Sequence, residues 1–170
     1  MDPSTQAINQ SLTFFVGTYS DSIQLVEFNP ATKSCSLKEK FTGVTNPSFL
    51  KHIPQDDILI AVKETAEDPT IFLIDLAKNS PTYGKIVQEL PSHGAHPCHI
   101  CYSPKNSLVF CSNYTGSTLS VFAYKAKRLE LIETITYTTG VTGEKGNKKR
   151  QEAPHPHSVT LDSTETFAFV

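Results

Sequence analysis

The sequence predicts an all-β fold and, within that class, part of a β-propeller. Short β-rich runs follow one another along the 170 residues, separated by turn residues that include 11 prolines and 8 glycines. A proline-led motif also recurs at about the spacing of one propeller blade. One four-stranded blade cannot bury both of its faces alone, whereas blades stacked around an axis cover each other.

The individual strands are predicted by apolar residues that alternate or run together between turn signals. Leu119 and Val121, for example, lie on either side of Ser120. We expect strands at 12–18, 22–29, 34–41, 48–53, 57–63, 70–76, 84–90, 97–102, 107–113, 118–124, 129–137, 156–161 and 166–170. Strands at this spacing are typical of sandwiches, barrels and propellers.

Two anchors, each found three times, favour the propeller among these architectures. Residues 46–50 (NPSFL) recur as 96–100 (HPCHI) and as 155–159 (HPHSV). A turn and a strand follow each copy, at 54–60, 104–110 and 163–169. The offset is 50 residues between the first two copies and 59 between the last two, so nine extra residues fall within 138–153.

Counting strands gives four blade units, at about 12–41, 48–90, 97–137 and 156–170, with a basic loop at 138–153. The two middle units supply four strands each, the first supplies three and the last supplies two. Residues 1–11 are expected to be a disordered or extended N-terminus. Because propellers close with about 4–8 blades, we expect a fragment with two complete and two partial blades. The alternative is a self-contained β-sandwich.

Composition excludes several classes of function. The chain has 15 Lys and Arg against 17 Asp and Glu, so no overall basic character predicts a nucleic-acid partner. Its longest strongly apolar run, 58–62, is too short for a membrane span, and no signal peptide is recognisable. With four cysteines, a reducing compartment is expected. We therefore expect a cytoplasmic protein without a membrane partner.

His155 and His157 are the strongest candidates for chemistry. Residues i and i+2 of an extended strand share a face, so both imidazoles should point the same way. A histidine suits proton transfer near neutral pH. The adjacent basic loop, with Lys148 and Arg150, could hold an anion. The alternative is a solvated basic loop beside two histidines of a turn.

Glu64 and Asn113 lie at the ends of the second strands of successive units, where a propeller channel opens. Glu64 could act as a general base or bind a substrate hydroxyl, or it could be a carboxylate in solvent. His96, Cys98, His99 and Cys101 form a potential zinc-ligand cluster. Strand alternation argues against zinc, because it splits the two cysteines between the faces of the sheet. We expect no metal site.

Several of these segments together resemble the lactonase family with a seven-bladed propeller, the 6-phosphogluconolactonase type that includes cycloisomerase-like relatives. They are residues 16–19 (VGTY), 46–50, 61–64 (AVKE), 97–99 (PCH), 112–114 (SNY), 120–122 (SVF), and 150–151 (RQ) before 154–159 (PHPHSV). The matches run in the family's order and cover the N-terminal half of a member. One departure is Lys63, where the family usually has Asn.

The resemblance implies hydrolysis of a sugar-acid lactone in the oxidative pentose phosphate route, with a small anionic lactone as substrate and no cofactor. It implies His155, His157 and Glu64 as catalytic residues. Arg150, Lys148, Asn113 and Gln151 are the implied substrate-binding residues. Since the other half of the site would be missing, we expect the chain alone to be inactive.

Two other functions fit the same residues. A lactone-forming cycloisomerase acting on a carboxylated muconate would use the same anion-holding and proton-handling groups. A non-catalytic propeller that serves as an interaction platform is the other, because propellers host many functions.

Overall fold

The computed structural model describes residues 10–138, 147 and 150–170 and confirms an all-β, propeller-like architecture. In chain order the strands are β1 Leu12–Val16, β2 Ser22–Asn29, β3 Ser34–Thr42, β4 Leu50–Ile53, β5 Ile58–Lys63, β6 Thr70–Asp75, β7 Ile86–Pro91, β8 Pro97–Ser103, β9 Leu108–Asn113, β10 Thr118–Lys125, β11 Arg128–Thr136, β12 Thr160–Leu161 and β13 Ala168–Phe169. No helix in the described residues has the length and hydropathy needed to cross a bilayer.

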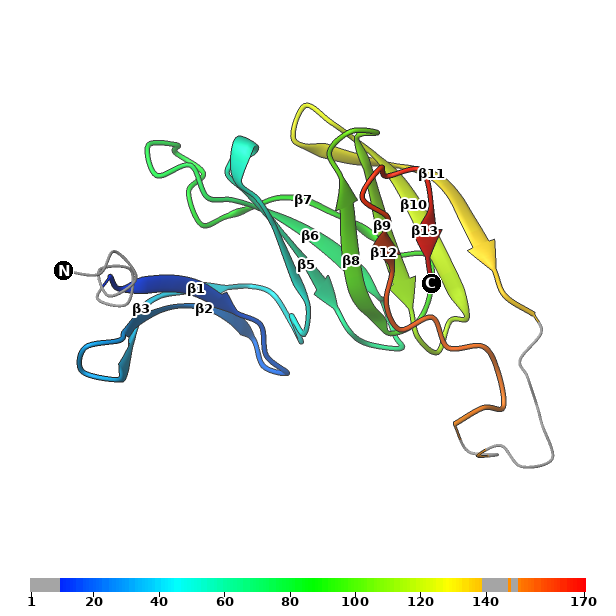
Figure 1. Cartoon of the computed structure of the whole chain (residues 1–170), viewed down its shortest axis with the longest axis horizontal. Coiled ribbons are helices and arrows are strands. Elements are labelled where there is room, and N and C mark those ends of the chain that lie inside the picture. Colours follow the sequence, from blue (N-terminus) through cyan, green and yellow to red (C-terminus); the bar gives the residue numbers. More distant parts are fainter. Residues whose placement is uncertain (1–9, 139–146, 148–149) are drawn as a thin grey trace.

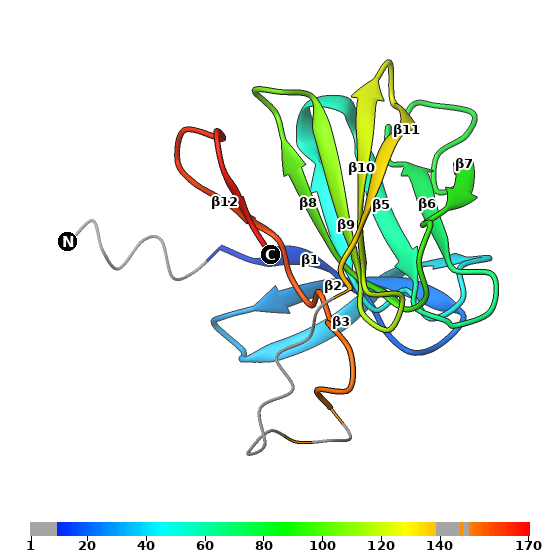
Figure 2. The same cartoon turned by 90° about the vertical axis from the view of Figure 1, so that its right-hand side faces the viewer.

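Each sheet is an antiparallel meander in which strands pair in chain order. The sheets are β1-β2-β3, β4-β5-β6-β7, β8-β9-β10-β11 and β12-β13. Figure 1 shows the β1–β3, β4–β7 and β8–β11 sheets one after another along the molecule, and Figure 2 shows β12 beside β8. Contacts link β4 and β5 to β8, and β8 to β12, so the first strands of successive sheets lie side by side.

Each predicted strand has an observed counterpart, and the two strands nearest the C-terminal end differ most. The strand expected at 156–161 is observed only as β12, and the one expected at 166–170 only as β13. Pro156, which lies within the first of these ranges, has no backbone N–H to donate to a ladder. The division of the chain into four blade units stays a prediction. Residues 1–9, and most of the predicted basic loop, lie outside the described residues.

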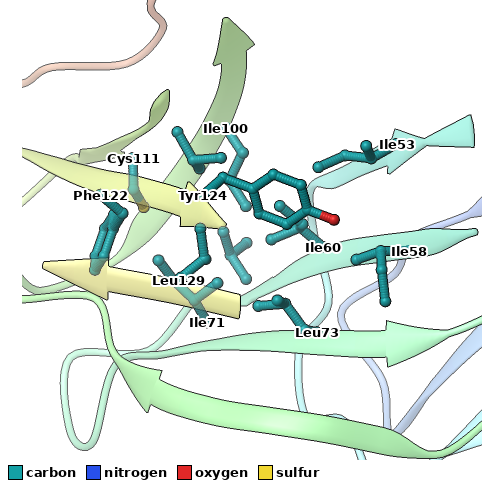
Figure 3. Packing of buried hydrophobic residues seen from close by; sticks show 12 residues of the cluster. Ile53, Ile58, Ile60, Ile71, Leu73, Ile100, Cys111, Phe122, Tyr124 and Leu129 are labelled. Atoms are coloured by element: carbon teal, nitrogen blue, oxygen red, sulfur yellow. The ribbon is translucent and has the colours of Figure 1, made fainter. Parts of the chain in front are cut away.

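The β5 strand is buried on both of its faces, which explains its continuous apolar sequence. Ile58, Ile60 and Val62 pack toward the β8–β11 sheet, in a cluster that includes Phe122. Leu59 and Ala61 pack on the opposite side, in a cluster with residues of the β1–β3 sheet. Figure 3 shows the first cluster filling the space between the two four-stranded sheets. These sheets therefore stabilise each other by stacking face to face.

The β12–β13 hairpin is attached to the β8–β11 sheet through Glu165. One oxygen of the Glu165 carboxylate accepts hydrogen bonds from Ser103 Oγ at 2.5 Å and from the Lys105 N–H at 3.0 Å. Asn106 Nδ2 donates to the Glu165 carbonyl at 2.8 Å, and Lys105 Nζ donates to the Thr164 carbonyl at 3.0 Å. The hairpin is therefore positioned by four hydrogen bonds to the turn that joins β8 to β9.

Within the hairpin, Asp162 organises the turn. Its carboxylate accepts hydrogen bonds from the hydroxyl of Thr164 and from the backbone N–H groups of Thr166, at 2.8 Å, and Phe167, at 2.7 Å. These hydrogen bonds, that of Thr164 first, hold the pKa of Asp162 at about 2. The ionised carboxylate is therefore the form that the turn stabilises.

We predict that Glu165→Ala lowers the free energy of unfolding by about 1–3 kcal/mol, because Ser103 and Lys105 lose a charged acceptor. Urea unfolding measures the change. Glu130→Ala, at an exposed position of β11, is the matched control and should change the free energy little. Equal effects of the two substitutions would contradict the role given to Glu165.

A second prediction concerns acid. The folded-state pKa of Asp162 lies below its ordinary value of 3.8, so its contribution to stability is complete above that value and is lost as pH falls through about 2. As pH is lowered from 5 to 2, the free energy of unfolding should therefore fall less steeply in Asp162→Asn than in the unsubstituted chain. The difference should develop roughly between these two pKa values. Identical acid profiles would contradict this assignment.

Candidate functional site

Three residues occupy equivalent positions of the repeat, namely Ser48, Cys98 and His157. The edge of the stacked sheets that they mark is called the inner rim here. Each lies near the start of the first strand of its unit. Cys98 is joined to the next unit, because its thiol lies 3.6 Å from the carbonyl oxygen of His157 and 3.7 Å from that of Pro156. Residues far apart in the sequence thus meet at one rim.

Cys98 is held as a neutral thiol. Burial, and after it the negative charge of Glu64, raise the pKa of Cys98 to about 11. A thiol that is deprotonated only at high pH is a poor nucleophile at neutral pH. Cys98 therefore links the two sides of the rim rather than reacting.

Glu64, predicted as a catalytic residue, lies at this rim and is held by two hydroxyl groups. Its Oε2 accepts hydrogen bonds from Tyr19 OH at 2.9 Å and from Ser48 Oγ. Tyr19 belongs to the turn between β1 and β2, so the carboxylate joins the first two sheets. The hydrogen bond to Glu64, burial and the charge of Glu64 together raise the pKa of Tyr19.

His155 is fixed in place by Tyr114 and Glu152. Its ring stacks on that of Tyr114, with centroids 4.3 Å apart and planes at 15°. Its Nδ1 lies 3.0 Å from the Tyr114 carbonyl oxygen, and its Nε2 lies 3.1 Å from Glu152 Oε1. The stacking and these two contacts fix the orientation of the His155 ring.

His157 is the histidine that faces solvent. Its ring meets the edge of Tyr114 at a centroid distance of 5.4 Å and an angle of 89°. Within the described residues, neither ring nitrogen has a hydrogen-bond partner. His155, His157 and Tyr137 help to line a hollow of about 350 Å³ on this side of the molecule. Of the two predicted histidines, His157 is therefore the one free to exchange a proton with a ligand.

Of the predicted anion-binding residues near the two histidines in the sequence, Arg150 and Gln151 lie within the described part of the chain. Arg150 is exposed. The pKa of Glu152 is lowered first by a backbone hydrogen bond of Glu152, then by the contact with His155, and then by the charge of Arg150. Gln151 uses its Oε1 to accept the Asn147 N–H at 2.7 Å, so it stabilises the local turn. Lys148 lies outside the described residues.

Asn113, predicted to bind substrate, lies in the interior instead. It is 0% exposed, and its Nδ2 is within 2.9 Å of Thr118 Oγ1, 3.2 Å of Ser120 Oγ and 3.3 Å of the Ser92 carbonyl. A buried amide with these partners cannot meet a ligand at the rim. The structure therefore corrects the prediction, and Asn113 supports the ends of β9 and β10.

Several residues of the site were not predicted from the sequence. Tyr19, Ser48, Tyr114 and Glu152 all contact predicted residues, as described above. The repeat alignment contained a signal for Ser48, because that position is occupied by His157 in the third copy. Among the described residues, no group of three or more His, Cys, Asp or Glu side chains is placed to bind a metal ion.

Comparison with known proteins gives this rim a context. Residues 13–170 match the family model described as lactonase, 7-bladed beta-propeller. A probable 6-phosphogluconolactonase of Arthroderma benhamiae is 23% identical over 157 residues, and a 6-phosphogluconolactonase of Formosa agariphila is 27% identical over 164. Each alignment covers 92% of this chain, but 39% and 45%, respectively, of the relative. The chain thus spans less than half the length of these curated relatives.

Solved structures show the same fold. A putative 6-phosphogluconolactonase of Bacteroides fragilis superposes with a TM-score of 0.78 at 24% identity, over 98% of this chain and 46% of that one. A periplasmic gluconolactonase of Pseudomonas aeruginosa gives 0.76 at 20% identity, over 94% and 47%. Taken with the match over almost the whole sequence, these findings show that the chain belongs to the lactonase family of seven-bladed β-propellers.

Proposed function

We propose that this chain carries part of the active site of a sugar-acid lactonase, with a 6-phosphogluconolactonase-like activity in the oxidative pentose phosphate route. The names of the curated relatives support this substrate class. The observation that carries the proposal is the exposed ring of His157, which has no hydrogen-bond partner among the described residues and shares Tyr114 as a ring contact with His155. An exposed imidazole suits proton transfer during the attack of water on an ester.

The reaction can be written with His157 as the only group that moves a proton. His157 accepts a proton from water as the water oxygen attacks the lactone carbonyl carbon. The ring C–O bond then breaks, and the leaving alkoxide takes the proton from His157. The product is the open-chain hydroxy acid, and the imidazole returns to its starting form. No cofactor takes part in this sequence.

The surrounding residues assist without exchanging protons. Cationic and hydrogen-bonding groups of the site stabilise the tetrahedral oxyanion, which is a large contribution in acyl transfer. Tyr114 contacts both histidine rings and fixes their relative orientation. The exposed Arg150, helped by Lys148, attracts the anionic lactone to the rim. Glu64 accepts a hydrogen bond from a sugar hydroxyl.

We predict that His157→Asn lowers lactonase turnover by about a hundredfold or more, because the proton acceptor is lost. The assay follows acid release from 6-phosphogluconolactone in a longer chain of which this sequence forms a part, since the chain alone is expected to be inactive. His52→Asn, on an exposed histidine of β4, is the control and should retain activity. Unchanged turnover in a His157→Asn, Arg150→Ala double variant would remove the assignment. Turnover of a carboxymuconate alone would favour the cycloisomerase.

The state of Glu64 gives a separate prediction. Because the hydrogen bond and negative charge of Glu64 disfavour the Tyr19 phenolate, Glu64→Gln should lower the pKa of Tyr19 toward its ordinary value of 10.0. A ¹³C NMR titration of labelled tyrosines measures this. Tyr83, whose OH donates to Glu39 at 2.7 Å and whose pKa is raised to about 12, is the internal control. An unchanged pKa of Tyr19 in Glu64→Gln would contradict the hydrogen bond between Tyr19 and Glu64.

A further inference from the structure

A second group of chemically active side chains lies on the inner wall, between the first strands of two sheets. Phe49 and Lys51 are two residues apart on one side of the β4 segment, and His99 and Cys101 are likewise two apart on β8. The two strands contact each other, and the rings of Phe49 and His99 have centroids 4.3 Å apart. These four residues therefore form one continuous patch, here called the wall cluster.

The hydrogen bond of His99 determines which of its nitrogens carries the proton. Its Nδ1 accepts the backbone N–H of Val159 at 3.3 Å, so in the neutral ring the proton is on Nε2. Within the described residues, Nε2 has no hydrogen-bond partner. Burial, then the nearby charges of His157 and Lys51, lower the pKa of His99. The ring thus stays a neutral N–H donor near neutral pH.

Lys51 supplies positive charge that the described part of the chain leaves unpaired. It is half-buried, and no carboxylate in the described residues forms an ion pair with it. Lys51 lies two residues along the chain from Phe49, whose ring contacts that of His99, and its strand β4 contacts β8, so the ammonium is within reach of His99 and Cys101. Burial raises the pKa of the Cys101 thiol, so this residue brings no competing negative charge. A half-buried cation without a counter-ion favours an anion from outside the chain.

We propose that Lys51 and His99 form an oxyanion-binding subsite on the inner wall, which takes the phosphate or carboxylate of an anionic ligand. The ammonium supplies charge and the imidazole Nε2–H supplies a directed hydrogen bond, which is the combination that a phosphate oxygen accepts well. If the proposed lactonase function holds, on which the identity of the ligand rests, the subsite holds the anionic substituent while the lactone carbonyl lies near His157.

The test is a titration of the ¹⁵N-labelled chain with inorganic phosphate, followed by NMR. Phosphate should shift the Val159 amide resonance, whose N–H contacts His99. Lys51→Met and His99→Leu should each weaken phosphate binding by about tenfold, as expected for the loss of one charge-assisted hydrogen bond. His99→Gln, which keeps an amide donor near the Nε2 position, should restore part of the affinity.

Matched controls separate the subsite from general charge and folding effects. Lys38→Met removes an exposed lysine of β3, and His52→Leu removes an exposed histidine of β4, and neither should change the affinity. An unchanged affinity for phosphate in Lys51→Met and His99→Leu would overturn the proposal. So would shifts, in the unsubstituted chain, that centre on Arg150 rather than on Val159, a result that does not depend on whether the variants fold.

Two further arms identify the ligand group and separate this proposal from the proposed function. Gluconate, which offers a carboxylate without a phosphate, should bind more weakly than phosphate if the doubly charged group is the natural ligand, and comparably if a carboxylate suffices. Phosphate binding that depends on Lys51 in a protein without lactonase activity would leave the subsite standing and remove the function. Lactonase activity with a KM unaffected by Lys51→Met would remove the subsite.

Discussion

Burial of the space between the β4–β7 and β8–β11 sheets is the constraint on which the rest of the molecule depends. Both faces of the β5 strand are buried. Ile58, Ile60 and Val62 face the β8–β11 sheet, and Leu59 and Ala61 face the β1–β3 sheet. Burial of each of these Ile, Leu and Val side chains contributes about 1.5–3 kcal/mol relative to exposure, which favours stacking of the sheets. Stacking in turn places the first strands together on the inside, with their starting residues at one rim.

The rim shows how a repeated backbone acquires different functions at equivalent positions. Ser48 donates its hydroxyl to Glu64, Cys98 is a neutral thiol that contacts the neighbouring unit, and His157 faces solvent. The backbone gives all three the same place relative to their sheets. The chemistry therefore arises from side-chain differences on a common frame, and a local change at one position leaves the frame intact.

The sequence was sufficient for the strands and their order, because alternation, turn residues and the repeat are local or periodic signals. The sequence was insufficient for Asn113. The repeat alignment showed that this residue lies at the end of its strand, but it did not show on which side of the sheet the side chain lies. Asn113 has the parity of Val109 and Cys111, which both enter the core, and this signal could have been used. The stacking of His155 on Tyr114 joins residues 41 apart, and no local pattern announces such a contact.

Charge at the site also illustrates why composition alone misleads. The formal net charge of −2 predicts no preference for an anionic ligand. At the site, however, Glu64 is bound by two hydroxyls and Glu152 is bound by His155, whereas Lys51 has no counter-ion among the described residues. An anion that approaches the inner wall therefore meets positive charge that is not neutralised locally. This asymmetry is a property of the stacked sheets, because it requires side chains from three successive units to be brought to one edge.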